Sequence, residues 1–421
     1  MSVNAPLESA APRVWTCPYC PLLCDDLHPG AGLGIASSGC GLAHQRLAQV
    51  QAPADTRPRV NGQPATLDEA LAAAAQVLVA SRQPLLAGLG TDVAGARALV
   101  PLALATGAIC DAAGGAALAQ ALRAQQDRGG FTTTLAEVHE RAEHIVFVGS
   151  WAPERAPRLL LRTAAGRAAP PTLLSLGAKP GDSCGLPVAE LPLQGDLLQT
   201  LASLAALVSG RTLRQPAPGL SALAQQLQDS RYAVLVWEPA QLGPHAALAI
   251  ERLQQIVGLL NRKTRAAGLP VGGAEGAATA NQVFAWMTGL PLRTRMGPTG
   301  LSHDPQTLDT AALLASGSVD ALLWISAFGG AAPPEAALPR IVLAPAFVGD
   351  RLGDESRTIF IPVATPGVGH GGHLFRTDGV VLMPLHACCD QAVPSVAEVA
   401  HRLGALRTAA MDTAPQKGVA A

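Results

Sequence analysis

The stretch LDEALAAAAQVLVASRQPLLAGLGTDVAGARALVPLALATGAICD, residues 67–111, decides the fold class. Its first part has helical apolar spacing, and a helix start is indicated by Thr66, with Asp68 and Glu69 in the first turn. "QPLLAGLG" is a short apolar run ending in glycine, which indicates a buried strand. A second helix, kinked at Pro101, and a second strand at "AICD" follow. This alternation predicts a parallel sheet with helices on both faces.

The same alternation continues along most of the chain and predicts an α/β fold. We expect two doubly wound parallel-sheet (Rossmann-like) blocks behind a small N-terminal Cys-rich head. The expected parts are the head at 1–55, the first block at 56–215, the second block with a C-terminal hairpin at 216–405, and a flexible tail at 406–421. Hairpin turns are indicated at Asn61-Gly62 and at Asp378-Gly379.

The head carries four closely spaced cysteines. "WTCPYCPLLCDDL", residues 15–27, contains Cys17, Cys20 and Cys24, and "SSGCGLAHQRL" adds Cys40, giving C-x2-C-x3-C-x15-C. Four Cys thiolates can hold a 4Fe–4S cluster. Structural zinc also accepts four Cys, but typically from two C-x2–4-C pairs. A triplet plus a single Cys therefore favours the cluster and leaves zinc open, whereas disulfides suit small secreted domains.

Other candidate ligands are weaker. His44 could bind zinc, although a lone His is more typical of a surface helix position. His370 and His373 form H-x-x-H, but no H-E-x-x-H helix or companion acid accompanies them, so we expect loop residues and no hydrolase metal site. The remaining cysteines lack motif spacing and are expected to be buried small hydrophobes: Cys110, Cys184, Cys388 and Cys389.

Composition excludes several classes of function. The net charge is −1, the pI is about 6.8 and aromatic residues make up 3%, so neither nucleic acid nor an anionic membrane is an expected partner. No apolar run reaches the ~18 residues of a membrane-spanning helix. The first residues have no signal-peptide pattern, and eight cysteines without an export signal indicate the cytoplasm.

The proportion of charged residues is low. Asp, Glu, Lys and Arg make up 14% of the chain, whereas roughly 25% is usual in globular proteins. Genomic drift towards Ala, Gly, Pro and Arg codons would produce this composition without functional meaning. Burial of much of the surface against other subunits would produce it too, because interface cores are depleted in charge.

Several segments resemble one family, in the same order. "CPYCPLLCDDL" and "SSGCGLA" resemble the cluster-binding head of the B subunit of formylmethanofuran dehydrogenase. Three further stretches are similar to the same protein: "TTLAEVHERAEHIVFVGSWAPERAPRL", "GLPVGGAEGAATANQVFAWMTGLPLRTRM" and "HLFRTDGVVLMPL". The resemblance spans about residues 15–405 and implies the molybdopterin oxidoreductase fold. In redox-active relatives it also implies a molybdenum or tungsten pterin.

The chain departs from those relatives where their metal ligand lies. They place a Cys or selenocysteine on a loop shortly after a strand that ends in Asp. "GAICD" matches that strand end, with Asp111 in place, but the following "AAGGAALAQAL" contains no Cys, Ser or Asp. Such a metal needs an anionic protein donor, and Cys110 precedes Asp111 inside the strand. Molybdopterin is therefore expected to be absent.

In lacking this ligand, the chain resembles the branch of the family that belongs to the bacterial formyltransferase/hydrolase complex. The resemblance implies a non-redox structural subunit, without catalytic residues of its own, beside amidohydrolase-like, formyltransferase and glutamate-synthase-like subunits. That complex takes a formyl group from formyl-tetrahydromethanopterin to a furan-type carrier and releases formate in one-carbon metabolism. Two alternatives stay open. One is the redox-active B subunit of a formylmethanofuran dehydrogenase, and the other is an iron–sulfur or zinc module on an unrelated α/β protein.

Overall fold

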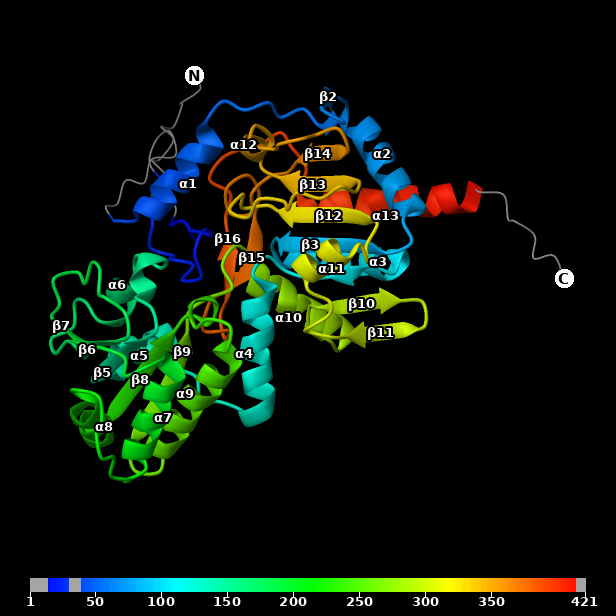
Figure 1. The fold of residues 1–421 in the computed structure, drawn as a ribbon. Helices are drawn as coiled ribbons and strands as arrows, with labels where there is room; N and C mark the ends of the chain where they lie inside the picture. The colour runs from blue at the N-terminus through cyan, green and yellow to red at the C-terminus, as the bar shows by residue number, and fades with distance from the viewer. Residues whose placement is uncertain (1–13, 30–38, 414–421) are drawn as a thin grey trace, which may run out of the picture.

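The computed structural model describes residues 14–29 and 39–413, which form two large sheets and a separate two-stranded hairpin (Figure 1). The larger sheet lies in the upper part of the view and the smaller sheet in the lower left part, with helix α4 (Gly115–Arg128) between them. Both sheets have helices against their faces. The prediction of a mixed α/β fold with parallel sheets is therefore confirmed.

The larger sheet has a parallel centre with antiparallel edges. Its central strands β4, β3, β12, β13 and β14 are parallel, and a hairpin flanks them on each side. In order across the sheet, the strands are β11 (Gly300–His303), β10 (Thr294–Gly297), β4 (Ile109–Cys110), β3 (Pro84–Gly90), β12 (Ala321–Ser326), β13 (Arg340–Ala344), β14 (Thr358–Pro362), β1 (Arg59–Val60) and β2 (Gln63–Pro64).

The smaller sheet is parallel throughout. In order, its strands are β7 (Val188–Leu191), β6 (Thr172–Leu176), β5 (His144–Val148), β8 (Tyr232–Trp237) and β9 (Arg265–Pro270). All six residues of β8 are buried, as expected for a central strand covered on both faces. A separate hairpin pairs β15 (Gly372–Phe375) with β16 (Leu382–Leu385).

Helices cover both faces of each sheet. Against the larger sheet lie α2 (Leu67–Ala80), α3 (Val93–Thr106), α10 (Ala277–Thr288) and α13 (Val396–Thr413) on one face, and α11 (Thr310–Ser316) and α12 (Ala346–Gly349) on the other. Against the smaller sheet lie α7 (Leu197–Val208), α8 (Leu220–Asp229) and α9 (Ala246–Leu260) on one face, and α1 (Gly41–Gln51), α5 (Leu135–Arg141) and α6 (Leu159–Thr163) on the other. Two short 3₁₀ turns are η2 (Ala152–Glu154) and η3 (Pro239–Gln241).

Local signals in the sequence explain several element boundaries. Thr66 caps α2, and its hydroxyl accepts from the Glu69 N–H while the Glu69 carboxylate accepts from the Thr66 N–H. The turn at Asn61-Gly62 joins β1 and β2 with φ values of 51° and 76°, as a type I′ hairpin requires. These two predictions are confirmed, and so is the turn at Asp378-Gly379 between β15 and β16.

The sheets divide the chain differently from the expected blocks at 56–215 and 216–405. The larger sheet takes strands from 59–110 and 294–362, and the smaller sheet takes all of its strands from 144–270. The smaller unit is thus inserted into the larger one. Periodicity identifies a strand but not its neighbour, because sheet pairing is decided by tertiary packing.

The C-terminal end of the chain differs from expectation in part. The flexible tail expected at 406–421 is wrong for its first part, because helix α13 continues to Thr413. Residues 414–421 lie outside the described chain, as do 1–13 and 30–38 of the expected head. None of the helices in the described ranges combines the length and apolarity that crossing a membrane requires.

Candidate functional site

The cysteine head is a closed loop. The Trp15 N–H donates to the Leu27 carbonyl at 2.8 Å, and the Cys17 N–H donates to the Cys24 carbonyl at 2.9 Å. The indole Nε1 of Trp15 also donates to the carbonyl of Gly367 at 2.6 Å. The head therefore rests on the C-terminal part of the chain, and its buried side chains belong to the same core as one face of the smaller sheet.

All four head thiols are buried in that core. Burial raises the pKa of Cys20 to about 12 and that of Cys24 to about 11, and neighbouring head cysteines add to the effect. Burial and Cys20 also raise the pKa of Cys17. Backbone N–H groups oppose these shifts, that of Tyr19 at Cys17 and that of Leu22 at Cys20. N–H groups directed at sulfur stabilise thiolates and are common around iron–sulfur clusters.

The residue types of the head suit a metal centre, but the arrangement of their side chains does not. Cys17, Cys20, Cys24 and Cys40 are the residue type that a 4Fe–4S cluster or structural zinc needs. In the described ranges, however, no group of three or more His, Cys, Asp or Glu side chains is arranged to hold a metal ion. The thiols lie in one cluster without forming a ligand set, so their role as ligands stays a prediction.

In the described ranges, none of the three candidate histidines joins the head cysteines in a possible metal site. His44 lies exposed on α1, and His373 is exposed on β15. His370 is half-buried, with its Nδ1 2.6 Å from the carbonyl oxygen of Gly371.

The structure adds a thiol pair that the sequence did not indicate. Cys388 and Cys389 pack against the head core, and both of their N–H groups donate to the carbonyl of Val368 at 3.0 Å. Burial raises the pKa of Cys388 to about 12. Tyr19 is buried in the same core, and burial raises its pKa, with smaller contributions from Cys17, Cys388 and Cys389. No spacing rule connects residues so distant in the chain.

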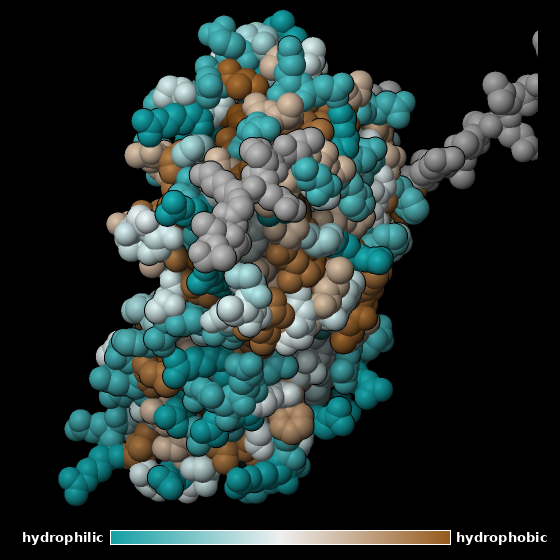
Figure 2. All heavy atoms as spheres, turned by 90° about the vertical axis from the view of Figure 1, so that its right-hand side faces the viewer, coloured by the Kyte–Doolittle hydropathy of each residue, from teal (hydrophilic) through white to brown (hydrophobic). Residues whose placement is uncertain are grey.

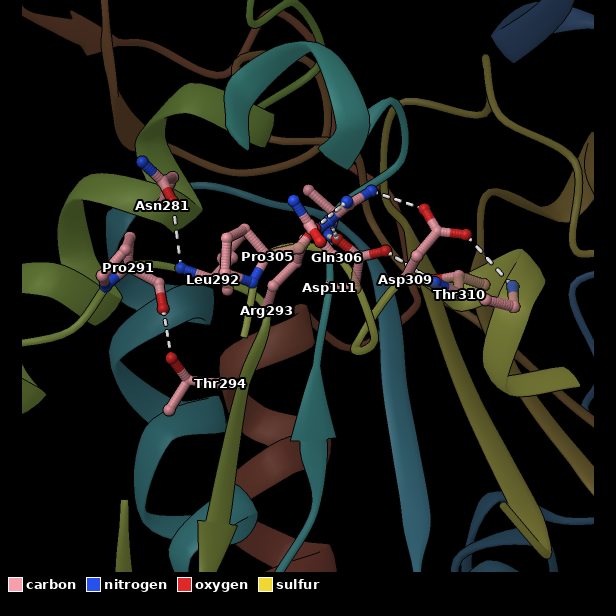
Figure 3. A network of polar contacts seen from close by, with 12 residues as sticks. Asp111, Asn281, Pro291, Leu292, Arg293, Thr294, Pro305, Gln306, Asp309 and Thr310 are labelled. Carbon is pink, nitrogen blue, oxygen red and sulfur yellow. Dashed lines mark hydrogen bonds and ion pairs between the residues drawn. The ribbon is translucent and has the colours of Figure 1, made fainter. Parts of the chain in front are cut away.

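A buried ionic network holds the end of β4 (Figure 3). The Arg293 Nε donates to Asp111 Oδ1 at 3.2 Å, and its Nη2 donates to Asp309 Oδ2 at 2.5 Å. Thr310 donates to Asp111 Oδ2 from both its N–H, at 2.9 Å, and its hydroxyl, at 2.8 Å. Burial nevertheless raises the pKa of Asp111, against the lowering effect of Arg293. Asp111 is thus a structural anchor for the segment that follows.

That segment is the start of α4, which the sequence did not predict as a helix. The Ala113 N–H donates to the Gly88 carbonyl at 2.8 Å, so the segment lies close to the end of β3. A Cβ at Gly115 would lie 2.1 Å from Asp111 Oδ1, so only glycine fits there. The first turns of α4 present Ala117, Leu118 and Ala121 to a cavity between the two sheets, and Gln125 and Gln126 line the same cavity further along the helix. The side chains of Ala117, Leu118 and Ala121 cannot donate a lone pair to a metal.

A cavity of about 980 Å³ lies between the two sheets. It is lined by the last residue of four parallel strands: Gly90 of β3, Ser326 of β12, Trp237 of β8 and Pro270 of β9. Parallel α/β sheets bind ligands outside the carboxyl ends of their strands, and here the carboxyl ends of both sheets meet at one space. Tyr19 of the head, Arg46 of α1 and residues of α4 and α10 complete the walls.

The charged groups that line this cavity are paired with one another. Arg46 Nη2 lies 2.7 Å from Glu275 Oε1, and burial raises the pKa of Glu275 although Arg46 lowers it. Arg155 donates to both carboxylate oxygens of Glu238 at 2.6 Å. The fifth charged lining residue is Glu154, which lies 3.7 Å from Arg155. The walls therefore offer little net attraction for a ligand with several negative charges.

The fold and this cavity define an α/β protein with a ligand-sized space where two parallel sheets face each other. No family model matches the chain. The chain is 32% identical over 368 residues to the B subunit of the formyltransferase/hydrolase complex Fhc of Methylorubrum extorquens, covering 86% of this chain and 98% of the relative. The crystal structure of the FhcABCD complex from the same organism, in complex with methylofuran, contains a chain that matches with a TM-score of 0.75 and 30% identity. That match covers 85% of this chain and 100% of the other.

A more distant relative belongs to a redox system. The B subunit of the tungsten-containing formylmethanofuran dehydrogenase 2 of Methanocaldococcus jannaschii is 25% identical over 399 residues, covering 86% of this chain and 91% of the relative. The chain belongs to the family of Fhc B subunits. The resemblance inferred from the sequence is thereby confirmed.

Proposed function

We propose that this chain is a non-redox, structural subunit of a formyltransferase/hydrolase complex. The complex would move a formyl group from formyl-tetrahydromethanopterin to a furan-type amine carrier. Hydrolysis of the resulting formamide then consumes one water and releases formate and the free amine. Membership of the family of Fhc B subunits supports this assignment, together with a matching chain whose complex was solved with methylofuran.

The residues at the start of α4 that line the cavity support the non-redox part of the proposal. A molybdenum or tungsten pterin needs an anionic protein donor to complete its metal site. After Asp111 the chain presents Ala113, Gly114, Ala117 and Leu118 to the cavity, and these residues supply hydrogen or methyl groups only. The phosphates of a pterin dinucleotide also need cations, whereas Arg46 and Arg155 are already paired with carboxylates. The residues present do not fit that cofactor.

The finer fold assignment belongs to the same proposal. We assign the two sheet units to the molybdopterin oxidoreductase type, preceded by the Cys-rich head expected at 1–55. Support comes from the shared cavity at the carboxyl ends of both sheets and from the distant similarity to the tungsten-containing relative.

We propose amidohydrolase-like, formyltransferase and glutamate-synthase-like subunits as partners. A charged fraction of 14% supports extensive subunit contact. Several large apolar side chains are exposed, including Trp286, Met287, Val380 and Leu382. Figure 2 gives one face of the molecule, on which apolar residues gather near the middle. We also propose a cytoplasmic location, which the eight free thiols support.

The head, in this proposal, holds a structural 4Fe–4S cluster or zinc. Four buried thiols in one cluster and the N–H groups directed at Cys17 and Cys20 support it. Because no ligand set is formed by the described side chains, binding would require the four sulfur atoms to turn towards one point. The centre would stabilise the fold and take no part in formyl transfer.

Replacing Cys20 with serine tests the head. We expect Cys20→Ser to lower the free energy of unfolding by about 2 kcal/mol or more, because a hydroxyl replaces a buried thiol and a ligand is lost. The rate of formyl transfer by the intact complex should not change. Thermal unfolding and activity of the purified complex measure both quantities. Cys184→Ser is the matched control, since Cys184 is exposed and is not one of the residues of the head core. Equal stability of the two variants would contradict a structural centre.

Co-purification tests the proposed function as a whole. The chain, tagged in its native host, should be isolated with a fixed set of partner chains identified by mass, and molybdenum and tungsten should be far below one atom per chain. Either metal near one per chain would instead support the redox-active formylmethanofuran dehydrogenase alternative. Isolation as a monomer without partners would contradict both the structural-subunit and the redox-subunit assignments. It would favour the third alternative, an iron–sulfur or zinc module on an unrelated α/β protein.

A further inference from the structure

Two adjacent thiols lie beside the head core, and the proposed function gives them no role. Cys388 and Cys389 follow strand β16 in a bend of the chain, and both residues are half-buried. They pack against the apolar core that contains the four head cysteines. The head cysteines are only 3–5% exposed, so the pair is more accessible to a reagent in solution than the head thiols are.

The backbone holds both cysteines against one carbonyl group. The N–H groups of Cys388 and Cys389 each donate to the Val368 carbonyl oxygen at 3.0 Å, and the Cys389 Sγ lies 3.5 Å from the same oxygen. The neighbouring Gly367 carbonyl accepts from the Trp15 Nε1 at 2.6 Å, which fixes this segment against the head as well. Because both N–H groups share one acceptor, the Cα–Cβ bonds of the two cysteines keep a fixed relation to each other.

The two side chains also act on one another. Burial raises the pKa of both thiols. A contact between the side chains adds to the rise at Cys388 and opposes it at Cys389, which is the pattern expected when the Cys388 S–H donates to the Cys389 sulfur. The pair can therefore offer two neighbouring sulfur donors to a single atom.

This arrangement restricts the kind of atom that fits. Sulfur donors select soft centres. A tetrahedral zinc ion would need two further ligands, and the described ranges contain no group of three or more possible ligands. A linear two-coordinate ion would need its sulfur ligands on opposite sides. Trivalent arsenic that is bonded to one carbon meets the requirement, because it is pyramidal and takes two neighbouring thiolates.

We propose that Cys388 and Cys389 form a two-thiol site for a soft, pyramidal trivalent centre of the arsenic(III) type. With an organoarsenic(III) oxide, two S–H bonds and the arsenic–oxygen bonds break, two arsenic–sulfur bonds form, and one water leaves. Arsenic stays trivalent, so neither an oxidant nor a reductant is required. The site is separate from the cavity between the sheets, whose lining contains neither cysteine, and it goes beyond the proposed function.

Phenylarsine oxide, titrated against the purified full-length chain, tests the site. We expect one phenylarsenic group per chain by intact mass under native conditions. An excess of mercaptoethanol should leave this adduct in place, whereas dithiothreitol should remove it. The difference arises because the two linked thiols of the protein hold the arsenic at a high effective concentration, which a monothiol cannot match and a dithiol can.

Two variants locate the adduct. Cys388→Ser and Cys389→Ser each leave a single thiol and should lower the apparent affinity at least about hundredfold, the scale of the effective concentration that is lost with one of two linked donors. Cys184→Ser is the control, because Cys184 is exposed and has no adjacent thiol, and this variant should bind like the unchanged chain. If either serine variant does not fold, the other variant and the comparison of the two reagents still decide the question.

The proposal is overturned if no adduct forms on the folded chain, if mercaptoethanol removes the adduct as readily as dithiothreitol, or if the serine variants bind as tightly as the Cys184→Ser control. The last result would assign the adduct to the head cysteines instead. None of these measurements reports on molybdenum, tungsten or partner chains, so failure here leaves the proposed function standing.

Discussion

Replacing Gly276 with alanine is expected to lower the free energy of unfolding by about 3–5 kcal/mol. Gly276 precedes α10 with φ of +80°, and an added Cβ would lie 2.1 Å from the carbonyl oxygen of Thr91 and 2.8 Å from its nitrogen. Both atoms are backbone of the turn between β3 and α3, so neither can turn aside. The substitution would therefore separate α10 from this turn.

Gly289→Ala is the control for this prediction. Gly289 ends the same helix with the same φ of +80°, and nothing lies within 4 Å of its added Cβ. Its alanine variant should show backbone strain alone, about 1–2 kcal/mol. Denaturant titrations of the two variants separate strain from steric overlap. If the two variants lose the same free energy of unfolding, the Thr91 backbone can move away from the added Cβ, and the close contact between Gly276 and Thr91 is not rigid.

Replacing Arg293 with leucine is the second substitution that we expect to lower the free energy of unfolding strongly. The substitution leaves Asp111 and Asp309 without their cation in a buried site, and breaking such a network costs about 3–5 kcal/mol. Arg295→Leu is the matched control, because Arg295 lies two residues further on, exposed at the surface. It should change stability by less than about 0.5 kcal/mol. Similar losses in the two variants would contradict the role of the network.

The pH dependence of the Arg293→Leu variant provides a further measurement. Burial already raises the pKa of Asp111 in the folded chain, and loss of the guanidinium would raise that pKa further. A carboxyl whose folded pKa exceeds its unfolded value contributes stability at low pH and loses it as the pH rises through the folded pKa. The loss caused by Arg293→Leu should therefore grow from acidic to neutral pH. A loss that is constant across this range would argue against an ionised Asp111 as its cause.

The sequence predicted the individual elements better than their arrangement. The cap at Thr66 and the turn at Asn61-Gly62 are local, so a few residues determine them. Pairing of β3 with β12 is not local, because a whole second unit lies between them in the chain. Helix α4 was missed because Gly114 and Gly115 are poor helix formers, and the reason for glycine at 115 is its contact with Asp111.

The candidate site was predicted in one part only. Spacing identified Cys17, Cys20, Cys24 and Cys40, whereas Cys388 and Cys389 join them only through the fold. The cavity could not be predicted at all, since it is formed by the ends of four strands from distant segments. The sequence already showed that no Cys, Ser or Asp that could bind a metal follows shortly after Asp111. In the fold, these residues form the start of α4, which lines the cavity.

The insertion of the smaller sheet has a consequence for biosynthesis. The strands of the smaller sheet all come from residues 144–270, and the one bridge from β9 outside that range, Gly268 to Thr132, joins a residue made earlier. This unit can therefore fold while the ribosome is still translating the rest. Strand β3, although made earlier, has to wait for β12 before its second edge is covered. We therefore expect the smaller sheet to mature first, and the edge of β3 that pairs with β12 to stay uncovered until Ser326 has been translated.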